Sequence, residues 1–211
     1  MDISIQIGST RLAGILVIPD HARAIVLFAH GSGSSRLSLR NQSVARVLQE
    51  AKIATLLFDL LTEEEEILDN IDAHLRFDIE LLANRLKDVS NWVHSQEHTK
   101  HLSLGYFGAS TGAAAALVAA AQEPKRINAV VSRGGRPDLA GVSLKDVEAP
   151  TLLIVGSEDY QVLKLNENAL KQIRAKEKTL QIVSGATHLF EEIGTLEQAA
   201  RLAQEWFTRY L

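Results

Sequence analysis

The stretch LSLGYFGASTGAAAALVAAAQEP, residues 102–124, decides the fold of this chain. Its first part, residues 102–107, is a short and nearly continuous apolar run, which is typical of a strand buried on both faces of a parallel sheet. Its last part, residues 110–123, is rich in alanine and ends before Pro124, which is typical of a buried helix. The pentapeptide GASTG, residues 108–112, joins the two parts, so the stretch predicts a strand, a tight turn and a helix.

Similar apolar runs alternate with helical patterns along the rest of the chain. The further strands are expected at residues 24–29, 54–58, 129–132, 151–155 and 180–183. The further helices are expected at residues 41–51, 77–96, 162–175 and 195–210, with Thr195 and Gln198 in the positions of a capping box. At the start of the chain, residues 3–7 and 12–18 predict an antiparallel hairpin at a sheet edge. This alternation predicts an α/β domain with a mainly parallel sheet.

The length, cysteine content and net charge of the chain exclude several kinds of site and partner. The 211 residues predict one domain, residues 1–211, because domains commonly have about 100–200 residues. The chain has no cysteine, which excludes disulfides, thiolate metal sites and a cysteine nucleophile. A net charge of −4 weighs against nucleic acid and anionic membranes as partners. No leader pattern opens the chain and no apolar run is long enough to span a membrane, so we expect a cytoplasmic protein.

The pentapeptide at residues 108–112 has the form G-x-S-x-G in the strand–turn–helix context that an exposed serine nucleophile requires. The tight turn lifts the serine above the sheet edge in a strained backbone conformation. Glycine on either side avoids side-chain collisions in so tight a turn. The helix that follows points its first N–H groups at a developing oxyanion. Ser110 is therefore the predicted nucleophile.

A serine hydroxyl is a poor nucleophile without a base, and the base needs an acid that orients it. In this architecture the acid and then the base follow the serine along the chain. Asp159 and His188 come just after the last two expected strands, at the sheet edge where ligands of α/β proteins bind. The sequence therefore predicts a triad of Ser110, Asp159 and His188. Asp138, after the preceding strand, is the alternative acid.

The loop HGSGSSR, residues 30–36, follows the expected strand 24–29 and predicts part of an oxyanion hole. Its glycines let the backbone approach a ligand closely. The backbone N–H groups of Ser32 and Thr111 are the expected oxyanion donors. Phosphate cradling is the alternative, and it is disfavoured because the phosphate-binding glycine patterns are missing. We expect His30 to orient this loop rather than to act as a base.

Three arginines, Arg36, Arg133 and Arg136, lie on loops expected to follow strands. They are candidates for a clamp on a substrate carboxylate or another anion, because a guanidinium binds such groups with two parallel hydrogen bonds. Surface salt bridges with Asp138 or with the acidic run at residues 63–66 are the alternative. That acidic run is itself expected in a solvated loop or at the start of a helix.

The segment HSQEH, residues 94–98, matches a metallopeptidase pattern, with His94 and His98 one helical turn apart. It falls at the end of an expected helix, at the side of the sheet opposite the predicted triad. Histidines at a helix C-terminus also suit the helix dipole without any metal. We therefore expect no metal and no other cofactor.

On these motifs the chain resembles the α/β-hydrolase superfamily over essentially its full length, and within it the small hydrolases related to dienelactone hydrolase. The resembling stretches are FAHGSGSSR (28–36), LRFDIELLANRL (75–86), GASTG (108–112), APTLLIVGSED (149–159) and GATHLF (185–190). The resemblance implies a mostly parallel eight-stranded sheet with an antiparallel start and helices on both faces. It also implies the roles of nucleophile, acid and base for Ser110, Asp159 and His188. Dienelactone hydrolases proper use a cysteine nucleophile, so a serine here favours general ester hydrolysis.

We therefore expect a serine hydrolase whose partner is a small, soluble carboxylic ester. Only 18 residues, 133–150, lie where α/β hydrolases often insert a helical lid, which is too few for a lid of several helices. An acyltransferase with the same triad and a non-catalytic binding protein of this fold are the alternatives. The sequence leaves the oligomeric state open.

Overall fold

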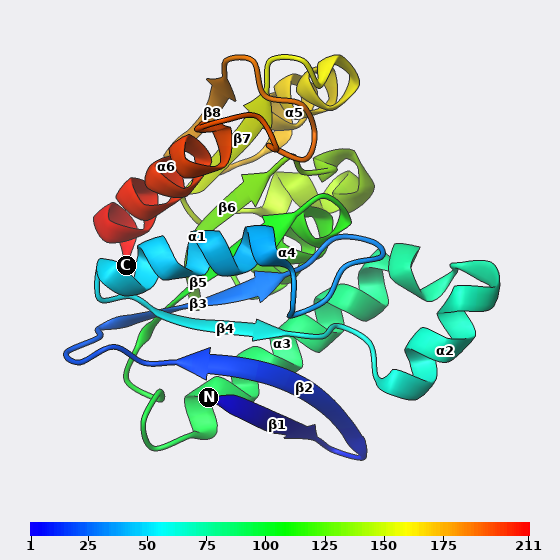
Figure 1. The fold of residues 1–211 in the computed structure, drawn as a ribbon, viewed down its shortest axis with the longest axis vertical. Coiled ribbons are helices and arrows are strands. Elements are labelled where there is room, and N and C mark those ends of the chain that lie inside the picture. Colours follow the sequence, from blue (N-terminus) through cyan, green and yellow to red (C-terminus); the bar gives the residue numbers. More distant parts are fainter.

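The eight strands form one sheet in the order β1-β2-β4-β3-β5-β6-β7-β8 (Figure 1). In this computed structural model, which describes residues 1–211, the strands are β1 (Asp2–Ile7), β2 (Thr10–Val17), β3 (Ala24–Ala29), β4 (Ala54–Phe58), β5 (Ser103–Ala109), β6 (Ile127–Arg133), β7 (Thr151–Gly156) and β8 (Lys178–Val183). The pairs β1–β2 and β2–β4 are antiparallel, and all other neighbours are parallel. The predicted sheet is therefore confirmed.

Helices cover both faces of this sheet. They are α1 (Leu39–Glu50), α2 (Glu63–Asp72), α3 (Ile79–Ser95), α4 (Thr111–Gln122), α5 (Tyr160–Gln172) and α6 (Thr195–Tyr210), with 3-10 helices η1 (Leu75–Phe77) and η2 (Pro137–Asp146). Buried residues of α3, α4 and α5 pack on one face, and those of α1 and α6 pack on the other. Figure 1 shows α1 and α6 in front of the strands and α3 behind them. Between β6 and β7 the chain forms only η2, so no multi-helix lid lies there.

Alternate residues of β3 enter the two cores, which explains its unbroken apolar sequence. Ile25 and Leu27 belong to the core on the α3–α4 side, whereas Val26 and Phe28 belong to the core on the α1–α6 side. A strand with both faces buried favours apolar side chains at every position. The unbroken apolar run at residues 24–29 therefore reflects the burial of both faces of β3.

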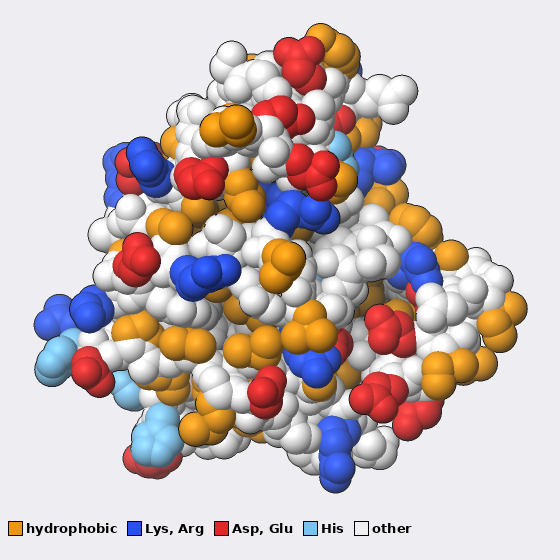
Figure 2. Space-filling view, in the orientation of Figure 1, with side chains coloured by type: hydrophobic (Ala, Val, Ile, Leu, Met, Phe, Trp, Pro, Cys, Tyr) orange, Lys and Arg blue, Asp and Glu red, His pale blue; other side chains and the backbone are white.

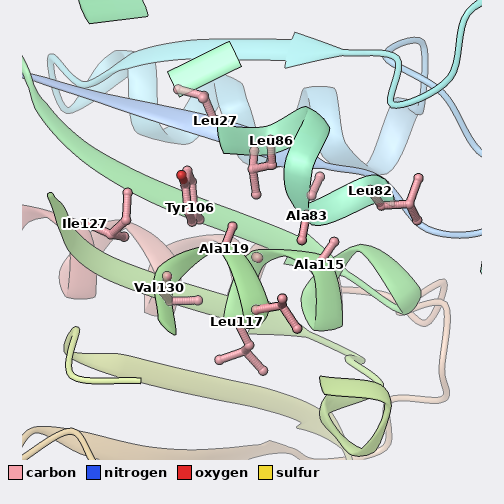
Figure 3. Close-up of a cluster of buried hydrophobic side chains, with 14 of the residues drawn as sticks. Leu27, Leu82, Ala83, Leu86, Tyr106, Ala115, Leu117, Ala119, Ile127 and Val130 are labelled. Atoms are coloured by element: carbon pink, nitrogen blue, oxygen red, sulfur yellow. The ribbon is translucent and has the colours of Figure 1, made fainter. Parts of the chain in front are cut away.

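The alanines of α4 let this helix lie close to the sheet and to α3. Figure 3 shows Ala115 and Ala119 of α4 in one buried cluster with Leu86 of α3 and Tyr106 of β5. The only polar atom that Tyr106 brings into this cluster is its hydroxyl, which shares a 2.7 Å hydrogen bond with Ser90. A paired hydroxyl avoids the cost of burying an unsatisfied polar group. The cluster thus anchors the strand and helix on either side of Ser110.

The acidic run at residues 63–66 begins α2 rather than lying in a loop. Thr62 Oγ1 accepts a 3.2 Å hydrogen bond from the Glu65 N–H, and the Glu65 carboxylate accepts a 2.8 Å bond from the Thr62 N–H. Four glutamates in the first turn also suit the positive end of the helix dipole. Figure 1 shows α2 projecting from the sheet, and Figure 2 shows hydrophobic side chains gathered over it.

The capping box predicted for Thr195 and Gln198 is wrong. Gly194, with φ of 81°, occupies the cap position of α6, and no side chain caps the helix. The Thr195 hydroxyl instead donates a 2.7 Å hydrogen bond to the Glu192 carbonyl. The left-handed glycine turns the chain into the helix one residue earlier than the pattern suggested. None of the helices in the molecule combines the length and the apolar character needed to cross a membrane.

Candidate active site

Ser110 stands on the turn between β5 and α4 in a conformation that L-residues rarely adopt. Its φ is 51° and its ψ is −121°. Neighbouring backbone holds it there, because the Ser110 N–H donates to the Arg133 carbonyl at 3.3 Å and its carbonyl accepts from the Arg136 N–H at 3.0 Å. Strain of this kind persists only where surrounding structure determines the conformation. The predicted tight, strained turn at the serine is therefore present, with Ser110 half-buried.

The two glycines of the pentapeptide are required by close backbone contact. A Cβ atom at Gly108 would lie 2.4 Å from Ala113 Cα, and one at Gly112 would lie 2.2 Å from the Ala29 carbonyl oxygen. Both distances are far inside van der Waals contact. Glycine at these positions lets α4 begin directly beside the end of β3, which brings the loop after β3 to Ser110.

Asp159 and His188 are joined by a hydrogen bond of 2.6 Å between Oδ2 and Nδ1. Asp159 precedes α5 in the cap position, yet its side chain makes no capping bond. Its side chain is 12% exposed, against 38% for His188. The alternative acid, Asp138, instead accepts two 2.8 Å hydrogen bonds from Arg136. The structure therefore brings Asp159, and not Asp138, to the histidine.

Ser110 and His188 line the same cavity, whose volume is about 210 Å³. Since Asp159 engages Nδ1 of His188, Nε2 is the ring nitrogen left to exchange a proton with a substrate or a nucleophile. Ser110 and His188 share no hydrogen bond in this structure. Such bonds commonly tighten only when substrate is bound.

Arg133 brings an unpaired positive charge to this cavity. It is the last residue of β6 rather than a loop residue, and it is only 7% exposed. Its guanidinium lies 5.6 Å from the centroid of the Phe190 ring, donates a 3.4 Å bond to Asn41 and leaves Nε without a partner. Burial, with a smaller effect of Arg40, lowers the pKa of Arg133 to about 10, so it stays charged at neutral pH. A buried cation of this kind is a ready-made anion site.

The other two candidate arginines are ion-paired and do not line the Ser110 cavity. Arg36 binds Asp59, and Arg136 binds Asp138. The surface-bridge alternative therefore describes them better. Sequence reasoning missed Arg40, which lines the cavity from α1 and lies 3.3 Å from Glu191. The feature of the sequence that could have indicated Arg40 is its position shortly after the HGSGSSR loop, residues 30–36.

His30 has both ring nitrogens engaged. Its Nε2 accepts a 3.1 Å hydrogen bond from the Leu60 N–H, so Nδ1 must carry the ring proton, which it donates to the Gly31 carbonyl at 3.0 Å. Burial lowers the pKa of His30, which favours this neutral form. His30 thus ties the loop after β3 to the segment after β4, and it is not free to act as a base.

The two expected oxyanion donors lie side by side, but one is occupied. The Ser32 N–H donates a 2.8 Å hydrogen bond to the Thr111 hydroxyl. Thr111 is the first residue of α4, and N–H groups in the first turn of a helix have no partner within the helix. The loop lies directly over the nucleophile, because a Cβ atom at Gly31 would be 3.0 Å from Ser110 Cβ.

The histidines of the HSQEH segment take no part in this site. His94 Nδ1 is hydrogen-bonded to the Ser90 carbonyl at 2.9 Å, within its own helix. Nowhere in the molecule are three or more histidine, aspartate or glutamate side chains grouped as metal ligands.

A strained serine turn and a carboxylate-held histidine at the carboxyl edge of this sheet define the class of protein, an α/β hydrolase. The model of the dienelactone hydrolase family matches residues 12–211, and the chain belongs to that family. A dienelactone hydrolase from Anabaena variabilis, solved by crystallography, is 57% identical, with a TM-score of 0.97 and 100% of this chain and 97% of that chain covered.

The chain is also similar to a more distant solved structure and to two longer proteins. Est1E from Butyrivibrio proteoclasticus shares the fold at 15% identity, with a TM-score of 0.81 over 99% of this chain and 98% of its own. Two Mycobacterium tuberculosis proteins named phosphoribosyl transferases, from two strains, are each 58% identical over 210 residues. Those residues are 100% of this chain but 46% of each relative, so the chain spans about half the length of the curated relatives it matches.

Proposed function

We propose that this chain is a serine hydrolase that cleaves small carboxylic esters through an acyl-enzyme intermediate. The observation that carries the proposal is the Asp159–His188 hydrogen bond beside the cavity that Ser110 lines. In the first step His188 Nε2 takes the Ser110 proton as Oγ attacks the ester carbonyl, and the alcohol leaves with that proton. In the second step His188 activates a water that releases the acid. Asp159 holds the imidazole in the required tautomer throughout.

We propose further that the preferred esters carry a carboxylate or another anionic group. Arg133 supports this, because it is a buried guanidinium in the Ser110 cavity with no carboxylate partner. An anion on the substrate would supply the charge-assisted hydrogen bonds that the free protein lacks. Of the three arginines predicted from the sequence, Arg36 and Arg136 are already neutralised by Asp59 and Asp138.

Replacement of the nucleophile tests the hydrolase proposal. Ser110→Ala should abolish turnover of aryl esters and covalent labelling by a fluorophosphonate, measured as a mass increase of the intact protein. Ser184→Ala, which changes an exposed serine in the loop after β8, is the matched control and should keep both. Undiminished turnover or labelling of Ser110→Ala would refute the assignment. A rate profile over aryl esters of increasing acyl length would define the acyl group.

An acyltransferase with the same triad is distinguished by its products. Added alcohols should leave the carboxylic acid as the main product if water is the normal acceptor, whereas a transferase would form a new ester. The name phosphoribosyl transferase belongs to relatives about twice as long as this chain, and the Ser110 site itself favours hydrolysis. The cytoplasmic location expected from the sequence stays a prediction.

A further inference from the structure

The turn that follows β6, at residues 134–135, is hydrogen-bonded to the nucleophile on both of its sides. Both of its residues are glycines, and both are buried. The Arg133 carbonyl just before the turn accepts a 3.3 Å hydrogen bond from the Ser110 N–H. The Arg136 N–H just after the turn donates a 3.0 Å bond to the Ser110 carbonyl. The path of this turn therefore determines where the backbone of Ser110 lies.

The same turn lies against the predicted base. Gly134 has a φ of 52°, which glycine adopts without steric cost. A Cβ atom at Gly134 would lie 3.2 Å from the carbonyl oxygen of His188 and 3.6 Å from its ring atoms Cε1 and Nδ1. Since Nδ1 is the atom that Asp159 engages, the turn packs directly beside the Asp159–His188 pair.

A buried amide on α5 holds this turn in place. Asn166 is 0% exposed, and its Nδ2 donates to the Gly135 carbonyl at 3.0 Å and to the Val162 carbonyl at 2.8 Å. Its Oδ1 has no hydrogen-bond partner. A buried amide oxygen without a partner costs stability, so packing alone would favour an apolar residue of similar size here. The contribution specific to Asn166 is the bond from α5 to the turn.

The helix that carries Asn166 also carries the predicted acid. Asp159 occupies the cap position of α5, and its carbonyl accepts a 2.8 Å hydrogen bond from the Leu163 N–H. Asn166 lies about two helical turns further along the same helix. The helix α5 therefore reaches His188 directly through Asp159, and it reaches His188 and Ser110 together through the turn at residues 134–135.

We infer that Asn166 is a positioning residue, which locks the turn at residues 134–135 and thereby sets the alignment of Ser110 with His188. Asn166 does not line the Ser110 cavity and acts only through the turn. Proton transfer between the two side chains depends on their alignment, and a misplacement of about 1 Å can lower a rate by about 10²-fold. The inference rests on the proposed serine hydrolase function, and it adds a residue that the sequence motifs do not single out.

Removal of the amide tests this role. Asn166→Leu removes the donor and keeps a side chain of similar size. We expect kcat for an aryl ester to fall about 10–100-fold. KM should change little, because neither Asn166 nor the turn lines the Ser110 cavity. The kcat is expressed per Ser110 counted by end-point fluorophosphonate labelling, so that unfolded molecules do not contribute.

A control variant separates positioning from a general loss of stability. Ile173 is 1% exposed and lies at the other end of α5, away from the turn. Ile173→Ala leaves a cavity there, so it should lower the melting temperature and keep the kcat of the wild type. If Asn166→Leu does not fold, Asn166→Ala, which suits a helix interior, takes its place in this comparison.

Two glycines with nearly the same conformation give an independent test. Gly134 and Gly141 have φ values of 52° and 53°, but a Cβ atom at Gly141 would meet nothing within 4 Å. Alanine is strained at both positions, so both variants should lower the melting temperature. Only Gly134→Ala brings a methyl group against His188, and only this variant should lower kcat, by about tenfold or more.

Three outcomes would overturn the inference. The first is a folded Asn166→Leu that retains the kcat of the wild type. The second is an equal loss of kcat in Asn166→Leu and Ile173→Ala, because reduced stability would then be the cause. The third is an equal loss of kcat in Gly134→Ala and Gly141→Ala, because contact of the turn with His188 would then not matter.

The wild-type protein distinguishes this inference from the proposal beneath it. A wild type without esterase turnover and without Ser110 labelling would refute the proposed function. An active wild type with an equally active Asn166→Leu would refute only the positioning role of Asn166.

Discussion

Oδ2 of Asp159 lies 2.6 Å from Nδ1 of His188, although 29 residues separate them along the chain. The bond fixes the tautomer of the imidazole and stabilises its charged form. We therefore expect Asp159→Asn to lower kcat by about 10³–10⁴-fold on an aryl ester, because an amide at this place favours the wrong tautomer. KM should change little, since Asp159 does not line the Ser110 cavity.

Asp138→Asn is the matched control for this prediction. Asp138 is also an aspartate shortly after a strand, in the first turn of η2, but its carboxylate binds Arg136. The kcat of Asp138→Asn should stay close to that of the wild type. A larger loss in Asp138→Asn than in Asp159→Asn would transfer the role of the acid to Asp138.

Substitution of Arg133 should separate anionic from neutral substrates. We expect Arg133→Met, which keeps the length of the side chain without its charge, to raise KM about tenfold or more for an ester that bears a carboxylate. This corresponds to the loss of a hydrogen bond between charged groups. KM for the neutral analogue should change much less. Because the charge is buried without a counter-ion, the melting temperature should not fall and is expected to rise.

Arg136→Met tests whether any nearby arginine would have the same effect. Arg136 lies three residues further along the chain, binds Asp138 and is outside the Ser110 cavity. Arg136→Met should leave the ratio of KM for the carboxylate-bearing ester to KM for its neutral analogue unchanged. Parallel tests with carboxylate and phosphate esters identify the anion, and equal KM changes for charged and neutral esters in Arg133→Met would exclude the clamp.

The buried His30 should make the protein less stable in mild acid. Burial lowers the pKa of His30 in the folded state, while in the unfolded chain a histidine has a pKa of about 6.5. The unfolded chain therefore binds more protons below that pH. Stability is fully present above about pH 6.5 and declines as the pH falls toward the folded pKa, by up to about 1.4 kcal/mol per pH unit.

Chemical denaturation at pH 7 and pH 5 measures this effect. His30→Gln removes the titrating ring, and its free energy of unfolding should fall less between the two pH values than that of the wild type. His98→Gln, which replaces an exposed histidine, is the control. An unchanged pH dependence in His30→Gln would show that other groups cause the acid sensitivity.

Local sequence patterns predicted most of the sheet and all three residues of the proposed triad. The run at residues 24–29 corresponds to β3 because both of its faces are buried, and the pattern of residues 195–210 corresponds to α6. The acidic start of α2 was ambiguous, because its capping box stabilises a helix with few apolar positions. The bounds of α6 were predicted correctly, but its capping box was not, because a left-handed glycine rather than a capping side chain precedes the helix.

The sequence by itself determined the strand–turn–helix around Ser110 and the order in which Asp159 and His188 follow it, because these depend on contacts within short segments. Only the tertiary structure decided which carboxylate meets His188, which arginine stays unpaired in the cavity and which group accepts the Ser32 N–H. Each of these depends on where loops from different strands converge at one edge of the sheet. Burial there removes solvent as a partner, so each polar group is defined by neighbours that are distant in the chain.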